Sequence, residues 1–126
     1  LRLGERRRLV ELGDVRAELE VVRRGLQACV ATGTASKLSV LKEFSVMGKT
    51  GTAEVGADDQ NNAWFAGYLP WSSRDGVQLC FCAVVYWVKD KTYGGEAAGQ
   101  VAADLLTQLR TDRELYGRYL QPESGR

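Results

Sequence analysis

The chain has 126 residues, the length of one ordinary domain, so a single hydrophobic core is expected. Its hydrophobic fraction of 44% and charged fraction of 26% are those of a soluble globular protein, which argues against a disordered or membrane class. Seventeen basic and sixteen acidic residues give a net charge of +1, so no general field attracts nucleic acid, and no nucleic-acid partner is predicted.

The first predicted element is a helix that follows a lead-in segment. Residues 1–13 show no strong period and are interpreted as a lead-in cut from something longer. From Asp14 onward, apolar residues recur at steps of three and four, which is the spacing of one stripe of a helix. Asp14 is the expected N-cap and Gly33 the expected stop. The stripe consists of Val15, Leu19, Val22, Leu26, Cys29 and Val30.

Three strands are predicted next. The first covers about residues 44–55, where two glycines weaken the pattern and suggest a close backbone approach. The second covers residues 63–69 and ends at Pro70. The apolar run 77–88 predicts a central strand covered on both faces, and it is too short to cross a bilayer as a helix. Neither a transmembrane segment nor an export signal is predicted in this sequence.

A second long helix is predicted from about residue 97 to Thr111, and a short helix could follow it before the C-terminal tail. Because consecutive strands joined by short turns pair antiparallel, we expect an α+β fold in which helices flank an antiparallel sheet of three strands. The stripe of the long helix consists of Ala97, Ala98, Val101, Ala102, Leu105, Leu106 and Leu109. The residues that suggest the short helix are Leu115, Tyr116, Tyr119 and Leu120.

The cysteines and aromatic residues are interpreted as parts of the core. Cys29, Cys80 and Cys82 lack the spacing of metal ligands, and the chain has no histidine, so no metal site is predicted. The missing histidine also excludes Ser-His and Cys-His nucleophiles, so that a base must be Lys, Asp or Glu. Cys80 and Cys82 share a face of the predicted strand about 7 Å apart, too far to pair without distortion. Four aromatic residues are expected in the core as well: Trp64, Phe65, Tyr86 and Trp87.

One motif carries chemistry. Lys49-Thr50-Gly51 matches the third signature of the penicillin-recognising serine acyltransferases. The match extends over Gly48-Lys49-Thr50-Gly51-Thr52-Ala53-Glu54 and Asn62-Ala63-Trp64-Phe65-Ala66-Gly67-Tyr68-Leu69-Pro70, with Gly33-Thr34-Ala35 before them and Tyr93-Gly94-Gly95 after them. Over about residues 15–109 the chain therefore resembles the C-terminal half of a penicillin-binding protein transpeptidase domain. It departs from the family at Gly99-Gln100, where a proline is common.

The resemblance implies an incomplete transpeptidase domain, with residues 14–111 as its C-terminal half between the lead-in 1–13 and a C-terminal extension 112–126. It also implies a role for each residue of the motif strand. Lys49 would supply positive charge to the carboxylate of a substrate or antibiotic and to the proton network of the nucleophile, and Thr50 would hydrogen-bond that carboxylate. Gly51 would let the ligand backbone lie flat, and the Thr52 amide would be one of two oxyanion donors.

The serine nucleophile of the family is not found in a usable place. Ser39-Val40-Leu41-Lys42 has the form Ser-x-x-Lys, but it lies in the run into the motif strand and is interpreted as a coincidence. Without a serine the chain alone is expected to be inactive, since no acyl-enzyme can form. It is expected to need the N-terminal half of the same domain or self-association, because the family's sheet has further strands. No cofactor is implied.

By resemblance, the activity is that of a peptidoglycan D,D-transpeptidase that binds stem peptides and is acylated by β-lactams. The implied location is the bacterial periplasm or the outer face of the cytoplasmic membrane, with an anchor in a segment absent from this chain. Two alternatives stay open. The first is a β-lactam sensor or another non-catalytic penicillin-binding module, and the second is a serine β-lactamase that hydrolyses the acyl-enzyme.

Overall fold

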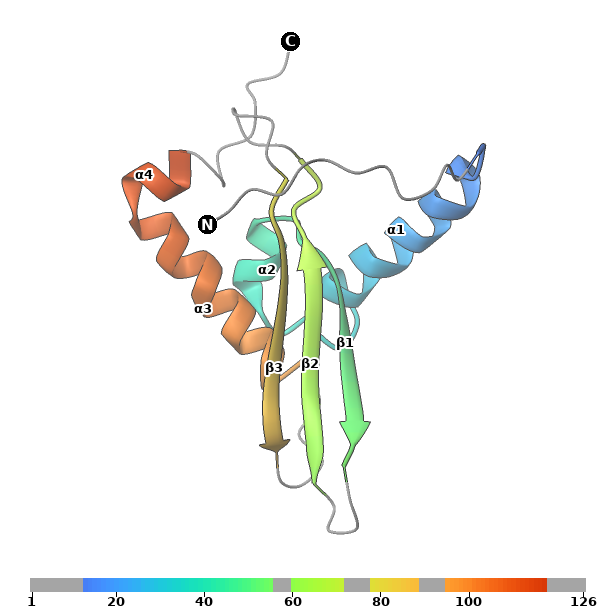
Figure 1. Cartoon of the computed structure of the whole chain (residues 1–126). Helices are drawn as coiled ribbons and strands as arrows, with labels where there is room; N and C mark the ends of the chain where they lie inside the picture. Colours follow the sequence, from blue (N-terminus) through green and yellow to red (C-terminus); the bar gives the residue numbers. More distant parts are fainter. Residues whose placement is uncertain (1–12, 56–59, 72–77, 89–94, 118–126) are drawn as a thin grey trace.

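The computed structural model describes residues 13–55, 60–71, 78–88 and 95–117, and it confirms the predicted α+β fold (Figure 1). Three predicted features lie wholly or partly outside the described residues: residues 1–12 of the lead-in 1–13, Tyr93-Gly94, and the end of the predicted terminal helix with Tyr119 and Leu120. The elements in chain order are α1 (Arg16–Ala31), α2 (Ser39–Glu43), β1 (Met47–Glu54), β2 (Asn61–Tyr68), β3 (Cys80–Val88), α3 (Ala98–Thr111) and α4 (Arg113–Leu115).

The three strands form an antiparallel sheet in the order β1-β2-β3. Within the described sheet β2 is therefore the central strand, and the prediction that residues 77–88 hold this position is wrong. The apolar composition of a strand depends on what surrounds its side chains. It does not show how many neighbouring strands pair with the backbone, so the composition of β3 could not give its place in the sheet. β1 and β3 are the two edges of this sheet.

The pairing register shows which side chains share a face. Thr50 lies opposite Phe65, which lies opposite Ala83, and these residues face the helices. One position earlier on β1, Lys49 lies opposite Ala66. Successive side chains of a strand point to opposite faces, so the side chains of Lys49 and Ala66 lie on the face away from the core. Figure 1 shows α1 beside β1 and α3 beside β3, with α2 between them. Helices α2 and α3 pack against the opposite face, so the face that carries Lys49 is called the uncovered face; α1 approaches it only near Met47 and Tyr68.

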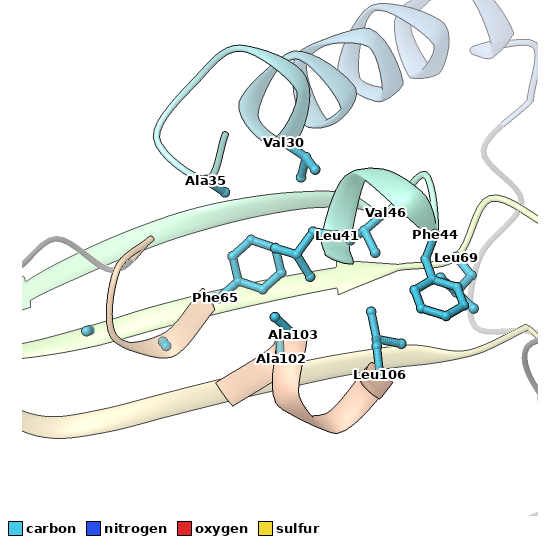
Figure 2. Packing of buried hydrophobic residues seen from close by; sticks show 12 residues of the cluster. Val30, Ala35, Leu41, Phe44, Val46, Phe65, Leu69, Ala102, Ala103 and Leu106 are labelled. Atoms are coloured by element: carbon cyan, nitrogen blue, oxygen red, sulfur yellow. The ribbon is translucent and has the colours of Figure 1, made fainter. Parts of the chain in front are cut away.

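The core lies between the sheet and the helices α2 and α3, together with the last turn of α1 (Figure 2). Phe65 is completely buried at its centre and stacks on Phe81, with ring centroids 6.1 Å apart. Burying a side chain of this size stabilises the fold by about 1.5–3 kcal/mol. The largest fully buried side chains are Phe65, Leu41, Leu69, Leu106 and Val46.

Helix α1 confirms the predicted helix but corrects both its start and its buried stripe. Its N-cap is Val15 without a side-chain cap hydrogen bond, so the prediction that Asp14 caps the helix is wrong: the helix begins one residue later than expected. Gly33 does follow its end, where its N–H donates to the Ala28 carbonyl oxygen at 2.9 Å. Leu19 and Val22 are exposed. Figure 1 shows the reason: the C-terminal end of α1 lies beside the sheet, and the N-terminal part of the helix extends away from it.

The short helix α2 was not predicted, since residues 39–43 hold too few positions to show a helical period. Its Leu41 is completely buried, and β1 follows three residues after the helix, later than the predicted start at residue 44. Helix α3 agrees with its prediction, and Gly99, where the family pattern has a proline nearby, is buried within it.

The interpretation of the cysteines and aromatic residues as core is correct only in part. Phe65 is buried, but five of these residues are exposed on β2 and β3, and Cys29 lies on helix α1 outside the buried core. Cys29 is half-buried, and the exposed residues are Cys80, Cys82, Trp64, Tyr86 and Trp87. The physical reason is that the strands are covered by helices on one face only in the described part of the chain.

Candidate active site

The residues of the motif lie on the edge strand β1. Lys49 is exposed on the uncovered face of the sheet, and its Nζ donates a hydrogen bond to the Thr50 carbonyl oxygen at 2.6 Å. Gly51 points its missing side chain to the same face, where an added Cβ would meet the Trp64 Cβ at 3.4 Å, an ordinary contact. The strand therefore offers a cation and a bare backbone side by side.

The peptide groups of β1 alternate between the neighbouring strand and the outer edge. The Val55 N–H donates to the Gln60 carbonyl oxygen at 2.9 Å, so odd-numbered residues of this strand point their peptide groups toward β2. The peptide groups of Thr50 and Thr52 consequently point to the outer edge. The contact between Lys49 Nζ and the Thr50 carbonyl oxygen agrees with this direction. An extended ligand that lay along this edge would face the Thr52 amide.

The Thr50 side chain lies on the opposite face from Lys49 and is only 8% exposed. Its Oγ1 is 2.6 Å from the Thr34 Oγ1, in the turn that follows α1. Gly95, just before α3, fits against the same pair, because an added Cβ would overlap the Thr34 carbonyl oxygen and lie 3.2 Å from the Thr50 Cγ2. Three segments that are distant in sequence thus meet at Thr50.

Cys29 completes this cluster from the last turns of α1. Its Sγ lies 3.5 Å from the Thr34 Oγ1. Burial by itself would raise the pKa of the Cys29 thiol, but hydrogen bonds from the Thr34 side chain and the Thr50 backbone, with the positive charge of Lys49, together hold it below its usual value of 9.0. The thiolate form is therefore favoured here more than in water.

An ion pair joins two of the same segments at the surface. Lys37 Nζ and Glu96 Oε1 are 2.9 Å apart, three residues after Thr34 and one after Gly95. The hydrogen bond to Glu96, and then its charge, raise the pKa of Lys37. Because the pair is exposed, it contributes little to the stability of the fold.

Sequence reasoning identified the motif strand but gave no role to Cys29 or Thr34. Thr34 was part of a motif, Gly33-Thr34-Ala35, and only its order along the chain was used. Cys29 carried no signal beyond its place in a helical stripe. Their distances to Thr50 result from the turn between α1 and α2, which no sequence period describes.

The residues Ser39 and Lys42 belong to α2, and both are exposed. No hydrogen bond between these two side chains is found in the described part of the chain.

A hollow of about 240 Å³ between α1 and the sheet, bordered by Gln27, Met47 and Tyr68 among others, includes none of the motif residues. The described residues hold no group of three His, Cys, Asp or Glu side chains that could bind a metal ion. None of the described helices is long and apolar enough to cross a membrane.

Comparison with known proteins assigns the family. Residues 16–107 match the sequence model of the penicillin binding protein transpeptidase domain, which covers more than half of the chain. No curated protein and no solved structure matches the chain. The matched region includes α1, α2, the whole sheet and most of α3, and with them the cluster around Thr50. The chain therefore belongs to the penicillin-binding protein transpeptidase domain family.

Proposed function

We propose that this chain forms one wall of the acyl-transfer cleft of a peptidoglycan D,D-transpeptidase, whose nucleophilic serine comes from residues outside this sequence. The observation that carries the proposal is the position of Lys49-Thr50-Gly51 on an edge strand, where the peptide groups of Thr50 and Thr52 point to the outer edge and those of Thr50 already contact Lys49 and Cys29. An edge of this kind can bind an extended stem peptide or the peptide-like frame of a β-lactam by backbone hydrogen bonds.

Each residue of the motif strand has a part in this proposal. Lys49 exchanges its contact with the Thr50 carbonyl oxygen for the carboxylate of the ligand, a charge-assisted interaction stronger than the neutral one that it replaces. On this proposal the Thr50 hydroxyl, although its side chain leaves the opposite face, hydrogen-bonds the same carboxylate across the outer edge of β1. Gly51 leaves room for the ligand backbone, and the Thr52 amide stabilises the oxyanion of the tetrahedral intermediate, a contribution of about 3 kcal/mol per donor in other enzymes.

The uncovered parts of the fold support a partner for this chain. Leu19, Val21 and Val22 on α1 are exposed, and so are Tyr86 and Trp87 at the β3 side of the sheet. We infer that the N-terminal half of the same domain covers these surfaces, with self-association as the alternative. On this proposal the chain alone is inactive, and the complete protein works in the bacterial periplasm or at the outer face of the cytoplasmic membrane.

The proposal is tested by acylation with a labelled penicillin. In the complete protein that contains this sequence, we expect a covalent adduct that lasts for hours and is detected by intact mass. Lys49→Ala should lower the acylation rate constant about 10- to 100-fold, because one charge-assisted hydrogen bond is lost. Lys42→Ala, at an exposed lysine of α2, is the matched control and should leave the rate unchanged. Equal rates for wild type and Lys49→Ala would contradict the proposal.

The lifetime of the adduct separates the alternatives. A transient adduct that is released by hydrolysis indicates a serine β-lactamase. The absence of any adduct in the complete protein indicates a non-catalytic penicillin-binding module. A lasting adduct without cross-linking of stem peptides indicates a β-lactam sensor. A lasting adduct together with cross-linking supports the transpeptidase.

A further inference from the structure

The proposed role of Thr50 depends on where its hydroxyl proton points. A threonine hydroxyl has one proton to donate and two lone pairs that accept. The Thr50 Oγ1 lies 2.6 Å from the Thr34 Oγ1, so one of these hydroxyls donates to the other. If Thr50 is the donor, its only proton is used within the protein. If Thr34 is the donor, the Thr50 proton is not used in this pair, and a ligand competes for it with the Cys29 Sγ, which the Thr50 side chain also reaches.

We propose that Thr34 is a positioning residue: its hydroxyl donates to Thr50 and so directs the Thr50 proton toward the carboxylate of a bound ligand. This inference rests on the proposed function of the motif strand and adds a residue outside it. Gly95 supports the arrangement, because its bare backbone packs closely against both Thr34 and the Thr50 side chain, where a larger residue would not fit.

Cys29 determines whether Thr34 is available as that donor. Its Sγ is 3.5 Å from the Thr34 Oγ1, within reach of a hydrogen bond to sulfur. As a thiol, Cys29 makes only a weak bond, and Thr34 donates to Thr50. As a thiolate, Cys29 attracts the Thr34 proton, so Thr34 must accept from Thr50. Deprotonation of Cys29 therefore turns the Thr50 proton away from the ligand.

Two effects of the thiolate act in the same direction and must be separated. Besides reversing the hydrogen bonds, its negative charge repels a carboxylate directly. Lys49 on β1 is the charged group that acts on Cys29 among the described residues, and it partly offsets this charge. Thr34→Val removes the hydrogen bonds of residue 34 but keeps the thiol, so it distinguishes reversal from repulsion.

The experiment compares two penicillin ligands on the complete protein, one with a free carboxylate and one as its methyl ester. At neutral pH, Thr34→Val should lower the acylation rate constant for the free carboxylate about three- to tenfold, the effect of one hydrogen bond. It should leave the rate for the ester unchanged. Thr34→Ser keeps the hydroxyl and should restore the rate for the carboxylate. An equal loss with both ligands means a purely structural role and overturns the inference.

A pH series tests the part played by Cys29. In wild type the ratio of the carboxylate rate to the ester rate should fall as pH rises through the titration of Cys29, and Cys29→Ser should remove this fall. In Thr34→Val the fall should also be absent. A fall that persists in Thr34→Val means that the thiolate acts without Thr34, by its charge or by its own hydrogen bond with the Thr50 side chain, and it overturns the role of Thr34.

Lys49→Ala is included to separate this inference from the proposed function. If Lys49→Ala acylates as fast as wild type, the proposed function itself fails. If Lys49→Ala is slow while Thr34→Val keeps the wild-type preference for the carboxylate, only the inference about Thr34 fails.

Discussion

The two edges of the sheet differ in how the rest of the chain holds them. β1 is held through close contacts with distant segments, since Thr50 meets Thr34 and Gly95. β3 carries exposed aromatic side chains, and Tyr86 and Trp87 are 61% and 69% exposed. The comparison indicates that β1 is fixed by contacts within this chain, as the proposed ligand-binding wall would require. β3 is left with apolar surface that a further segment or partner can cover.

The largest effect is expected from Gly95→Ala. The added Cβ overlaps the Thr34 carbonyl oxygen, which is backbone and cannot rotate away, so the free energy of unfolding should fall by about 3 kcal/mol. Gly25→Ala in α1 is the control: nothing lies within 4 Å of its added Cβ, and it should raise stability by about 0.5–1 kcal/mol. Denaturant unfolding measures both. If Gly95→Ala is as stable as wild type, β1 is not held in this way.

A pair of glycines within β1 separates packing from ligand access. In Gly48→Ala the new Cβ lies 2.6 Å from the Phe65 Cζ and 3.0 Å from the Ala66 carbonyl oxygen, so we expect a loss of about 2 kcal/mol in denaturant unfolding. Gly51→Ala meets only an ordinary contact and should change stability by less than about 0.5 kcal/mol. The same variant should nevertheless slow penicillin acylation. Fast acylation by Gly51→Ala would show that the ligand does not approach this position.

A smaller effect of opposite sign is expected at the other edge. Trp87 has φ of +55°, next to a register shift between β2 and β3, and its N–H donates to the Asn62 Oδ1 at 3.2 Å. Because glycine adopts this conformation without strain, Trp87→Gly should raise the free energy of unfolding by about 1 kcal/mol. Tyr86→Gly, at the neighbouring exposed position, should lower it by about 1 kcal/mol. Equal losses of stability in both variants would mean that the backbone of Trp87, next to the register shift, stores no strain.

The smallest effect concerns the titration of Cys29 in a variant that carries Cys80→Ser and Cys82→Ser. Its thiolate absorbance should rise below pH 9.0, and Thr34→Val should move the transition toward higher pH because a hydrogen bond to the thiolate is lost. Since the folded pKa is lowered, the unfolded chain binds more protons in this window. Stability should therefore increase with pH up to about 9.0 and be lost as pH falls through the folded pKa. A thiol that titrates at 9.0 in both proteins contradicts this prediction.

Local patterns were sufficient for most of the fold. The helix period located α1 and α3, and the order of strands and turns predicted an antiparallel sheet, because hydrogen-bonded neighbours were consecutive in the chain. The patterns failed where burial depended on other segments. The apolar residues of β3 were expected to be covered on both faces, yet Cys80 and Cys82 are exposed, since composition does not show which face the helices cover.

For the candidate site, the sequence by itself determined the family motif and the residues Lys49 to Thr52, because they are consecutive and need no tertiary contact to be recognised. The tertiary structure alone decided that Thr34, Cys29 and Gly95 surround Thr50. It also decided that Lys49 and Thr50 leave opposite faces of an edge strand. These contacts join segments that are up to 61 residues apart, as between Thr34 and Gly95, and their distances follow from how the helices pack on the sheet.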